Sequence, residues 1–352
     1  MGETKKLLSN STIIFVGAIV GSFFAYLFNM LVGRWLGPAQ YGEFSAIFSL
    51  LTILSVGGGT ILTVVMRYSG ELYATKNYQA ITKLLKVFSR YVLFFGLLLF
   101  FIGLILIKPI ANFFSIEHLL PVAIALSSFI FGFLILVNRG VLQGTQRFFA
   151  LSVTNCLEPF LRLVLGVILI KLGLEVSGAI LGAVLATVIA YFVTFVPLLN
   201  FLKKENNTES KASFAFDKKE IINYSFPTLI VTLLLAFSLN IDVVLVKHYF
   251  APEEAGMYAA ISTIAKIILY ATAPVISVMF PMISEKKAKG NKHFGIFLFS
   301  LLLTLAGALV ILAVYYVAPG KVISILYGNK YTSYFYLLPQ VGFFVILYAL
   351  VN

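Results

Sequence analysis

Two stretches of the chain share one pattern of proline, glycine and apolar residues: VGRWLGPAQYGEFSAIFSLL at 32–51 and VKHYFAPEEAGMYAAISTIA at 246–265. With a shift of 214 residues, 7 of the 35 positions in 32–66 are identical. In each stretch the proline and glycine stand between two apolar runs. The pattern predicts an internal repeat in which each copy contains a helix, a turn and a second helix. The prolines and glycines that align between the two copies are Pro38 with Pro252 and Gly42 with Gly256.

The whole chain is as apolar as these stretches. Of its 352 residues, 60% are hydrophobic and only 11% are charged, and the mean hydropathy is +0.99. A soluble domain carries about 25% charged residues. Ten continuous apolar runs are long enough to cross a bilayer as helices, and they do not alternate as the strands of a barrel would. The sequence therefore predicts an all-α polytopic membrane protein. The ten runs are 11–33, 44–66, 91–109, 120–142, 151–172, 178–202, 222–246, 257–283, 295–318 and 336–352.

The distribution of Lys and Arg predicts the orientation. One set of alternate loops holds 18 of the 26 cations, with Arg139 counted among them, and the other set holds 6. Cytoplasmic loops of membrane proteins carry the excess of positive charge, so we expect the N-terminus in the cytoplasm. The membrane that we expect is the cell membrane, that is, the plasma or inner membrane. The net charge of +12 then reflects topology and contact with anionic lipids, and no nucleic-acid partner is expected.

Six apolar runs separate the two copies of the repeat, so both copies begin on the same side of the membrane. We expect two parallel-related lobes of six helices each. Lobe one comprises residues 1–202, a cytoplasmic linker comprises 203–217, and lobe two comprises 218–352. Only about four helices fall in lobe two, and Asn352 aligns inside the fourth helix of lobe one. We expect an incomplete second lobe, as in a truncated chain or a fragment that lacks at least two helices.

Several segments resemble the polysaccharide-export flippases, whose superfamily includes the lipid II flippases and the multidrug and toxin extrusion (MATE) transporters. The resemblance implies a MATE-like fold and the flipping of a polyprenyl-pyrophosphate-linked oligosaccharide from the cytoplasmic to the outer leaflet by alternating access. It also implies membrane lipids and polysaccharide assembly proteins as partners. No cofactor is expected beyond H⁺ or Na⁺ as a coupling ion. The segments are RWLGPAQYGEF (34–44), SVGGGTILTVVMRYSGE (55–71), RGVLQGTQRF (139–148) and SFPTLIVTLLLAFSLNID (225–242).

Of the charged residues in the apolar runs, four are assigned to the membrane interior and not to loops: Glu158, Arg162, Asp242 and Lys266. Each would cost roughly 2.5–3.5 kcal/mol at the bilayer centre, so each must pair or line a wet cavity. Glu158 and Arg162 are four residues apart on one helix face. They either neutralise each other and seal lobe one, or Arg162 faces the central cavity to bind phosphate while Glu158 orients it. Pro159 between them is a candidate kink in the cavity wall.

The two charges of lobe two each have open alternatives. Asp242 either bonds to a neighbouring helix or forms, like Glu158, a candidate ion-coupling site for a proton or sodium. Lys266 either contacts a pyrophosphate, pairs with Asp242, or extends its amine towards the interface. No metal site is expected, because the single Cys156 excludes a cysteine cluster and the three histidines are far apart.

Further candidate positions are weaker. Arg34 and Arg67 stand at the ends of the first two spans. Each is either an anchor at the membrane interface or a phosphate ligand at one of the two mouths of the cavity. Asn29 is a candidate polar residue of the cavity. The run Gly57-Gly58-Gly59 is either a hinge or a tightly packed helix crossing.

Absent motifs exclude most enzyme classes. The chain contains no ATP-binding G-x-x-x-x-G-K-[ST] and no H-E-x-x-H. Its short loops leave no room for a catalytic domain, and a polysaccharide polymerase would need a large extracytoplasmic loop with clustered polar residues. A transporter is therefore expected rather than an enzyme. A drug or lipid II exporter of the same superfamily is the alternative cargo assignment, and the excess of cations over acids in the spans favours an anionic cargo.

Overall fold

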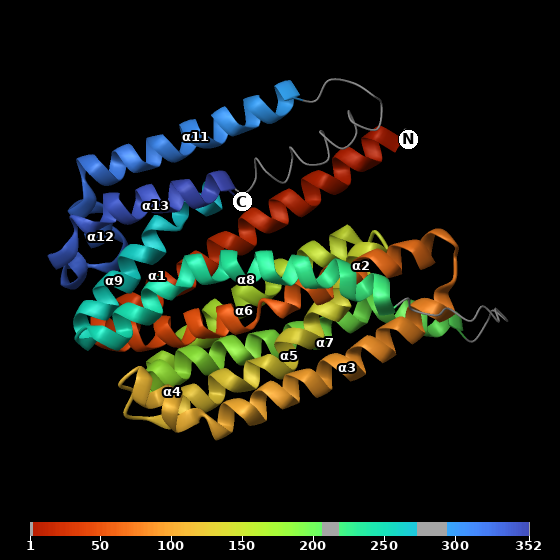
Figure 1. Ribbon diagram of the computed structural model, residues 1–352, viewed down its shortest axis with the longest axis horizontal. Helices are drawn as coiled ribbons and strands as arrows, with labels where there is room; N and C mark the ends of the chain where they lie inside the picture. Colours follow the sequence, from red (N-terminus) through yellow and green to blue (C-terminus); the bar gives the residue numbers. More distant parts are fainter. Residues whose placement is uncertain (1–2, 206–217, 273–293, 352) are drawn as a thin grey trace.

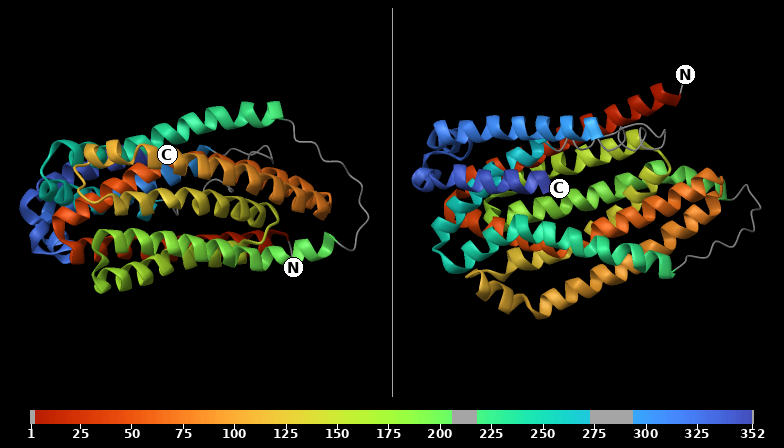
Figure 2. Two further views of the ribbon diagram at one scale, coloured as in Figure 1. Left: turned by 90° about the horizontal axis from the view of Figure 1, so that it is seen from below. Right: turned by 45° about the horizontal axis from the view of Figure 1, so that its top comes forward.

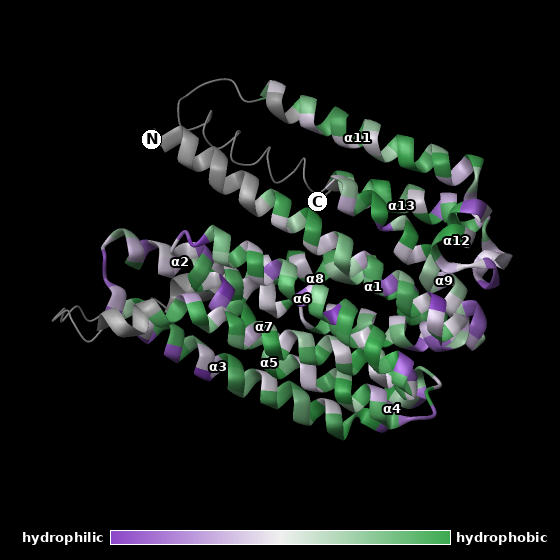
Figure 3. Cartoon of the chain, turned by 180° about the vertical axis from the view of Figure 1, so that it is seen from behind, coloured by the Kyte–Doolittle hydropathy of each residue, from purple (hydrophilic) through white to green (hydrophobic). Residues whose placement is uncertain are grey.

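The computed structural model describes residues 3–205, 218–272 and 294–351, and this part of the chain is built of helices without a strand. Figures 1 and 2 show the helices running alongside one another as an elongated bundle. Hydrophobic residues cover most of the helices, while hydrophilic residues gather at the two ends of the bundle and at isolated interior positions (Figure 3). The predicted all-α membrane architecture is confirmed.

Lobe one contains seven α-helices joined by short turns. A one-turn π-helix connects the last two of them. Their bounds are α1 (Glu3–Leu54), α2 (Gly57–Ala74), α3 (Tyr78–Ile105), α4 (Ile107–Phe113), α5 (Leu119–Gly144), α6 (Phe148–Leu169), η1 (Ile170–Leu174) and α7 (Glu175–Glu205).

Lobe two repeats this order over its described residues. A short helix, α12, follows α11 just as α4 follows α3 in lobe one. The bounds are α8 (Lys218–Tyr249), α9 (Pro252–Ala265), α11 (Phe294–Val317), α12 (Pro319–Tyr327), the 3₁₀ segment η2 (Asn329–Tyr334) and α13 (Leu337–Val351).

Helix α1 is a hairpin and crosses the bilayer twice. Gly37 has φ 76° and ψ 173°, a conformation that glycine adopts without strain, and it reverses the chain. The rings of Phe28 and Phe44 are consequently 5.8 Å apart, whereas sixteen residues of straight helix would separate them by about 24 Å. Gly173, with φ 86°, turns the chain between α6 and α7 in a similar way.

These two reversals account for the ten predicted crossings. Seven apolar helical stretches of the described chain are long enough to span a membrane. Two of them, Phe15–Leu54 and Phe148–Leu199, contain the reversals and cross twice, and the shorter apolar helix Leu337–Leu350 supplies the tenth crossing. The prediction of about ten helices is confirmed in number.

The structure corrects the predicted run 44–66. This run is not one helix, because α1 ends at Leu54 and α2 begins at Gly57. The Ser55 N–H still bonds to the Leu51 carbonyl at 2.8 Å, but the N–H groups of Val56, Gly58 and Gly59 bond to carbonyls three residues back instead of four. The crossing therefore breaks at Ser55 and Val56, immediately before the three glycines.

The predicted linker 203–217 lies mostly outside the described residues, as does the second half of the run 257–283. Residues 203–205 are the exception, because they form the last turn of α7.

The two copies of the repeat meet at their shared Pro–Gly turns. A Cβ added to Gly42 would lie 3.1 Å from the Pro252 carbonyl oxygen, and one added to Gly256 would lie 1.6 Å from the Pro38 carbonyl oxygen. Each glycine thus packs on the proline of the other copy, the reciprocal pattern of a two-fold axis. This contact supports the predicted parallel relation of the lobes and explains the glycines, since a side chain would separate the backbones.

Replacing Gly256 by alanine tests this contact. We expect Gly256→Ala to lower the thermal unfolding temperature of the purified protein, because overpacking costs about 1–3 kcal/mol. Gly307→Ala is the matched control, because no atom of the described residues lies within 4 Å of an added Cβ there. A Gly256→Ala protein as stable as the Gly307→Ala protein would contradict the close approach.

Candidate functional site

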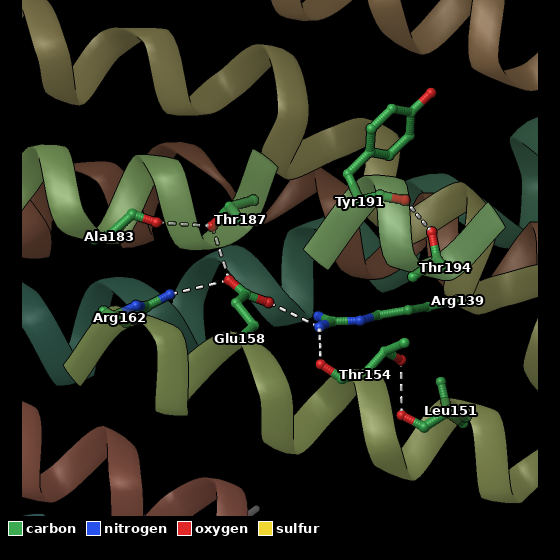
Figure 4. Close-up of polar contacts among 9 residues, drawn as sticks. All are labelled: Arg139, Leu151, Thr154, Glu158, Arg162, Ala183, Thr187, Tyr191 and Thr194. Atoms are coloured by element: carbon green, nitrogen blue, oxygen red, sulfur yellow. Dashed lines mark hydrogen bonds and ion pairs between the residues drawn. The ribbon is translucent and has the colours of Figure 1, made fainter. Parts of the chain in front are cut away.

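The interior charge of lobe one is organised around Glu158 on α6. Its Oε2 accepts a hydrogen bond from Arg139 Nη2 at 2.7 Å, and its Oε1 accepts one from Arg162 Nη2 at 3.1 Å. Thr187 of α7 donates to the same Oε1 at 2.9 Å. Figure 4 shows the carboxylate between the two guanidinium groups, with Thr187 beside it. Three helices, α5, α6 and α7, therefore supply one network.

The network carries an excess positive charge. Arg139 and Arg162 share one carboxylate, and both arginine Nε atoms are buried without a hydrogen-bond partner in the described part of the chain. An unsatisfied buried donor is costly, and it is more costly when the group is charged. The site therefore retains donors and charge that an anion would satisfy.

This network lines a cavity of about 520 Å³. Lobe one contributes Arg139, Glu158, Arg162 and Thr187, and α8 of lobe two contributes Thr232 and Ala236. The cavity, which we call the lobe-one cavity, consequently lies where the lobes face each other. A ligand held there would touch both lobes.

A second cavity of about 300 Å³ adjoins the first, since Phe48 and Thr52 line both. The guanidinium of Arg162 lies over the Phe48 ring at 5.8 Å. The second cavity also contains Asn29 and Lys266, whose amine lies 3.5 Å from Asn240 Oδ1. Two predicted residues, Asn29 and Lys266, therefore line one cavity between the lobes.

A third cavity of about 490 Å³, the lobe-two cavity, contains Asp242 and again Lys266. The hydroxyls of Tyr258 and Ser262 both donate to Asp242 Oδ2 at 3.0 Å. Oδ1 is buried and has no partner within the described residues. Asp242 thus bonds to its neighbouring helix through one oxygen, while its other oxygen has no partner among the described residues.

Predicted pairing of Lys266 with Asp242 is not seen. The ion pairs of the described chain within 4.0 Å involve Arg67, Arg139 and Arg162. A metal site would require a group of three or more His, Cys, Asp or Glu side chains, and the described residues contain no such group.

Arg34 and Arg67 lie away from these three cavities. Arg34 bonds to the Ile325 and Leu326 carbonyls of α12, and Arg67 pairs with Glu71 at 3.2 Å on the exposed side of α2. Neither arginine contacts the Glu158 network, so the idea that they frame the cavity mouths receives no support from their positions.

The glycine run divides into two roles. Gly58 packs tightly, since an added Cβ would lie 2.4 Å from Leu136 Cδ1, whereas Gly59 lines the lobe-one cavity. Gly57 begins α2 directly after the break. Helix α6 stays helical through Pro159, which removes the N–H that would bond to the Asn155 carbonyl.

Sequence reasoning missed Arg139. It was counted among the loop cations, yet it lies in α5 and holds Glu158 at the shortest distance in the network. Two features of the sequence could have identified Arg139 as a site residue. It falls within the predicted run 120–142, and the interior carboxylate of Glu158 needs a positively charged partner. Thr187 carried no signal, because a threonine in an apolar helix is common.

Comparison with known proteins agrees with this architecture. The sequence model of the polysaccharide biosynthesis protein family matches residues 7–287. A probable multidrug resistance protein, YoeA of Bacillus subtilis (strain 168), is 25% identical over 296 residues, which cover 77% of this chain and 59% of the relative. The chain thus spans about 59% of that relative's length.

Two solved structures show the fold. A multidrug resistance MATE transporter in its inward-facing conformation superposes with a TM-score of 0.64 at 16% identity, covering 95% of this chain and 84% of that one. A MOP-superfamily transporter from Pyrococcus furiosus, described as having a binding pocket of reverse polarity, superposes with a TM-score of 0.55 at 14% identity, covering 97% and 92%. The chain therefore belongs to the polysaccharide biosynthesis protein family and shares the fold of these two transporters.

Proposed function

We propose that the protein moves a polyprenyl-pyrophosphate-linked oligosaccharide from the cytoplasmic to the outer leaflet of the cell's inner membrane, with its N-terminus in the cytoplasm. The observation that carries this proposal is the sharing of one carboxylate by Arg139 and Arg162 in the lobe-one cavity. The family match to polysaccharide biosynthesis proteins supports the same cargo class.

The cavities favour an anion. Across the three cavities, the charged lining residues comprise three cations and two acids. A guanidinium binds phosphate through two parallel N–H donors, and it does so strongly where water is excluded. A pyrophosphate in the lobe-one cavity would therefore neutralise the excess charge and supply acceptors for the buried Nε atoms. The charged lining residues are Arg139, Arg162, Lys266, Glu158 and Asp242.

Alternating access follows from the contact of both lobes with the cargo. The cargo's phosphate groups lie on lobe one, its sugars face polar groups such as Asn29 between the lobes, and its lipid tail stays in the bilayer. Rocking of the lobes about the cargo then moves the head group across the membrane. We propose the helix break at Ser55, next to Gly57, as a hinge in the cavity wall.

We propose Asp242 as the ion-coupling residue, with H⁺ or Na⁺ as the ion. Its Oδ2 is held by two hydroxyl donors, while the buried Oδ1 is free to accept a proton or to coordinate a cation. An ion can drive transport only if its affinity differs between the two lobe arrangements. Because Tyr258 and Ser262 lie on α9 and Asp242 on α8, a relative shift of these helices would change that affinity. Glu158 is the weaker candidate for this role, since both of its oxygens are already bonded.

Drug efflux is the second candidate function. The multidrug resistance relative and the MATE neighbours favour it. A cationic drug would be drawn to Asp242 rather than to the arginine pair. Competition by a cationic drug against a pyrophosphate lipid therefore distinguishes the two cargoes. Polysaccharide assembly proteins are the partners proposed with the first function, and membrane lipids surround the chain in either case.

Translocation in liposomes tests the arginine pair. The readout is protection of a polyprenyl-pyrophosphate oligosaccharide from an external glycosidase. We expect Arg162→Ala to lower the rate by about 10-fold or more, since a hydrogen bond to a charged group contributes about 1.5–3 kcal/mol. Arg162→Lys should restore part of the rate, because it keeps the charge and loses the paired donors. The exposed Lys108→Ala is the control. A full rate in the folded Arg162→Ala protein would contradict the phosphate role.

Replacing Asp242 tests ion coupling. In Asp242→Asn the residue no longer exchanges a proton or binds a cation, so transport should lose its dependence on an imposed H⁺ or Na⁺ gradient. Residual downhill movement of cargo should persist, because the arginine pair is intact. Glu253→Gln removes an exposed acid from the first turn of α9 and should keep the dependence. Unchanged gradient dependence in the Asp242→Asn protein would rule out the coupling role.

A further inference from the structure

Arg34 and His248 occupy equivalent positions in the two copies of the repeat, 214 residues apart. Each stands near the end of the first helix of its lobe, just before the Pro–Gly turn. That end of the bundle also carries α4 and α12 (Figure 1). We call it the outer end, because the Lys and Arg distribution predicts that it is extracytoplasmic.

Arg34 of lobe one reaches into lobe two. Its Nε donates to the Leu326 carbonyl at 2.8 Å, and its Nη2 donates to the Ile325 carbonyl. Both carbonyls lie in the last turn of α12, where helix carbonyls lack a partner from their own helix. A cation at this position also interacts favourably with the helix dipole.

His248 of lobe two makes the reverse contact. Its Nδ1 lies 2.6 Å from the carbonyl oxygen of Phe113, the last residue of α4 in lobe one. Because a carbonyl only accepts, Nδ1 carries the hydrogen and donates. The imidazole also stacks on the Phe113 ring, with centroids 4.0 Å apart and planes inclined by 4°.

The two acceptor helices are themselves equivalent. Phe113 ends α4 and Tyr327 ends α12, again 214 residues apart. Tyr327 packs against lobe one as Phe113 packs against lobe two, since a Cβ added to Gly33 would lie 2.5 Å from its ring. Tyr327 also shares a hydrogen bond of 3.0 Å with Tyr41. The basic residue of each lobe thus holds the short outer helix of the other lobe.

We propose that these exchanged contacts form a reciprocal clasp that keeps the transporter closed at its outer end, with Arg34 and His248 as positioning residues of the transport cycle. Every clasp contact joins one lobe to the other, so the clasp exists only while the outer ends lie together. Opening to the outside must break both halves. The clasp therefore sets the balance between closed and open states, whatever the cargo is.

Labelling from outside tests the clasp. Ser49 is buried and lines the cavity between the lobes, so a cysteine there should react with a membrane-impermeant maleimide only when the outer end opens. The background is Cys156→Ser with Ser49→Cys, in cells. Arg34→Met removes the donors but keeps the stem, and His248→Phe keeps the stacking ring. We expect each to raise the labelling rate about two- to tenfold, the effect of losing a hydrogen bond worth about 0.5–1.5 kcal/mol. The double variant should approach the product of the two effects.

Three controls make the result specific. Lys171→Met removes an outer cation that lies over Trp35 within lobe one, and it should leave the rate unchanged. A cysteine at Thr194, buried inside lobe one, should stay unlabelled, because its exposure would report loosening of the lobe. Asn207→Cys should label only from the cytoplasmic side.

Two results at the buried cysteines would overturn the proposal, and one result at the Asn207→Cys control would do so too. One is an unchanged labelling rate at Ser49→Cys in the folded single variants. The other is an equal rise in labelling at Thr194→Cys, because the two residues would then stabilise the fold without controlling the outer end. Labelling of Asn207→Cys from outside would reverse the assigned sides and would equally overturn the clasp as an outer closure. Since no readout involves cargo, failure here is separate from failure of the proposed function.

Discussion

Charge compensation inside a bilayer is the constraint on which the rest of the structure depends. A lone glutamate or arginine at that depth costs several kcal/mol, so helices that carry such groups must bring them together. Glu158 satisfies this need by joining α5, α6 and α7 through Arg139, Arg162 and Thr187. The compensation is incomplete by one positive charge. That remainder, beside a cavity shared with lobe two, is the basis of the proposed binding of an anion.

The relation between the lobes rests on a different physical requirement, the close approach of two backbones. Gly42 and Gly256 allow the repeated turns to pack reciprocally at the outer end, where a side chain would hold them apart. The exchanged contacts of Arg34 and His248 surround this point. Central binding groups and outer contacts are thus arranged about one pseudo-two-fold axis, the geometry that rocking of the lobes requires.

Sequence patterns predicted the fold well because the length of each apolar run and the position of each Pro–Gly turn are local properties of the sequence. The ten crossings and the parallel repeat were readable in this way. The break at Ser55 and Val56 was not, because a local change to hydrogen bonds three residues back leaves no mark in the pattern of apolar residues. The site was readable in part. Glu158, Arg162, Asp242 and Lys266 stand out as interior charges and do line the cavities, but their partners depend on helix packing. Packing therefore decides that Arg139 joins Glu158 and that Arg34 contacts α12.

The central claim is that the Glu158 network recognises the phosphate of a lipid-linked cargo, and binding measures it most directly. Thermal unfolding of the purified protein can be followed while polyprenyl pyrophosphate or the corresponding polyprenol is added. A ligand that binds only the folded state stabilises it by RT ln(1 + L/Kd) at free concentration L, so the unfolding temperature rises with the ligand concentration. The account predicts concentration-dependent stabilisation by the pyrophosphate, little by the polyprenol, and loss of the difference when Arg139 and Arg162 are both replaced by alanine. Equal stabilisation by both lipids, or stabilisation by a cationic drug alone, would contradict it.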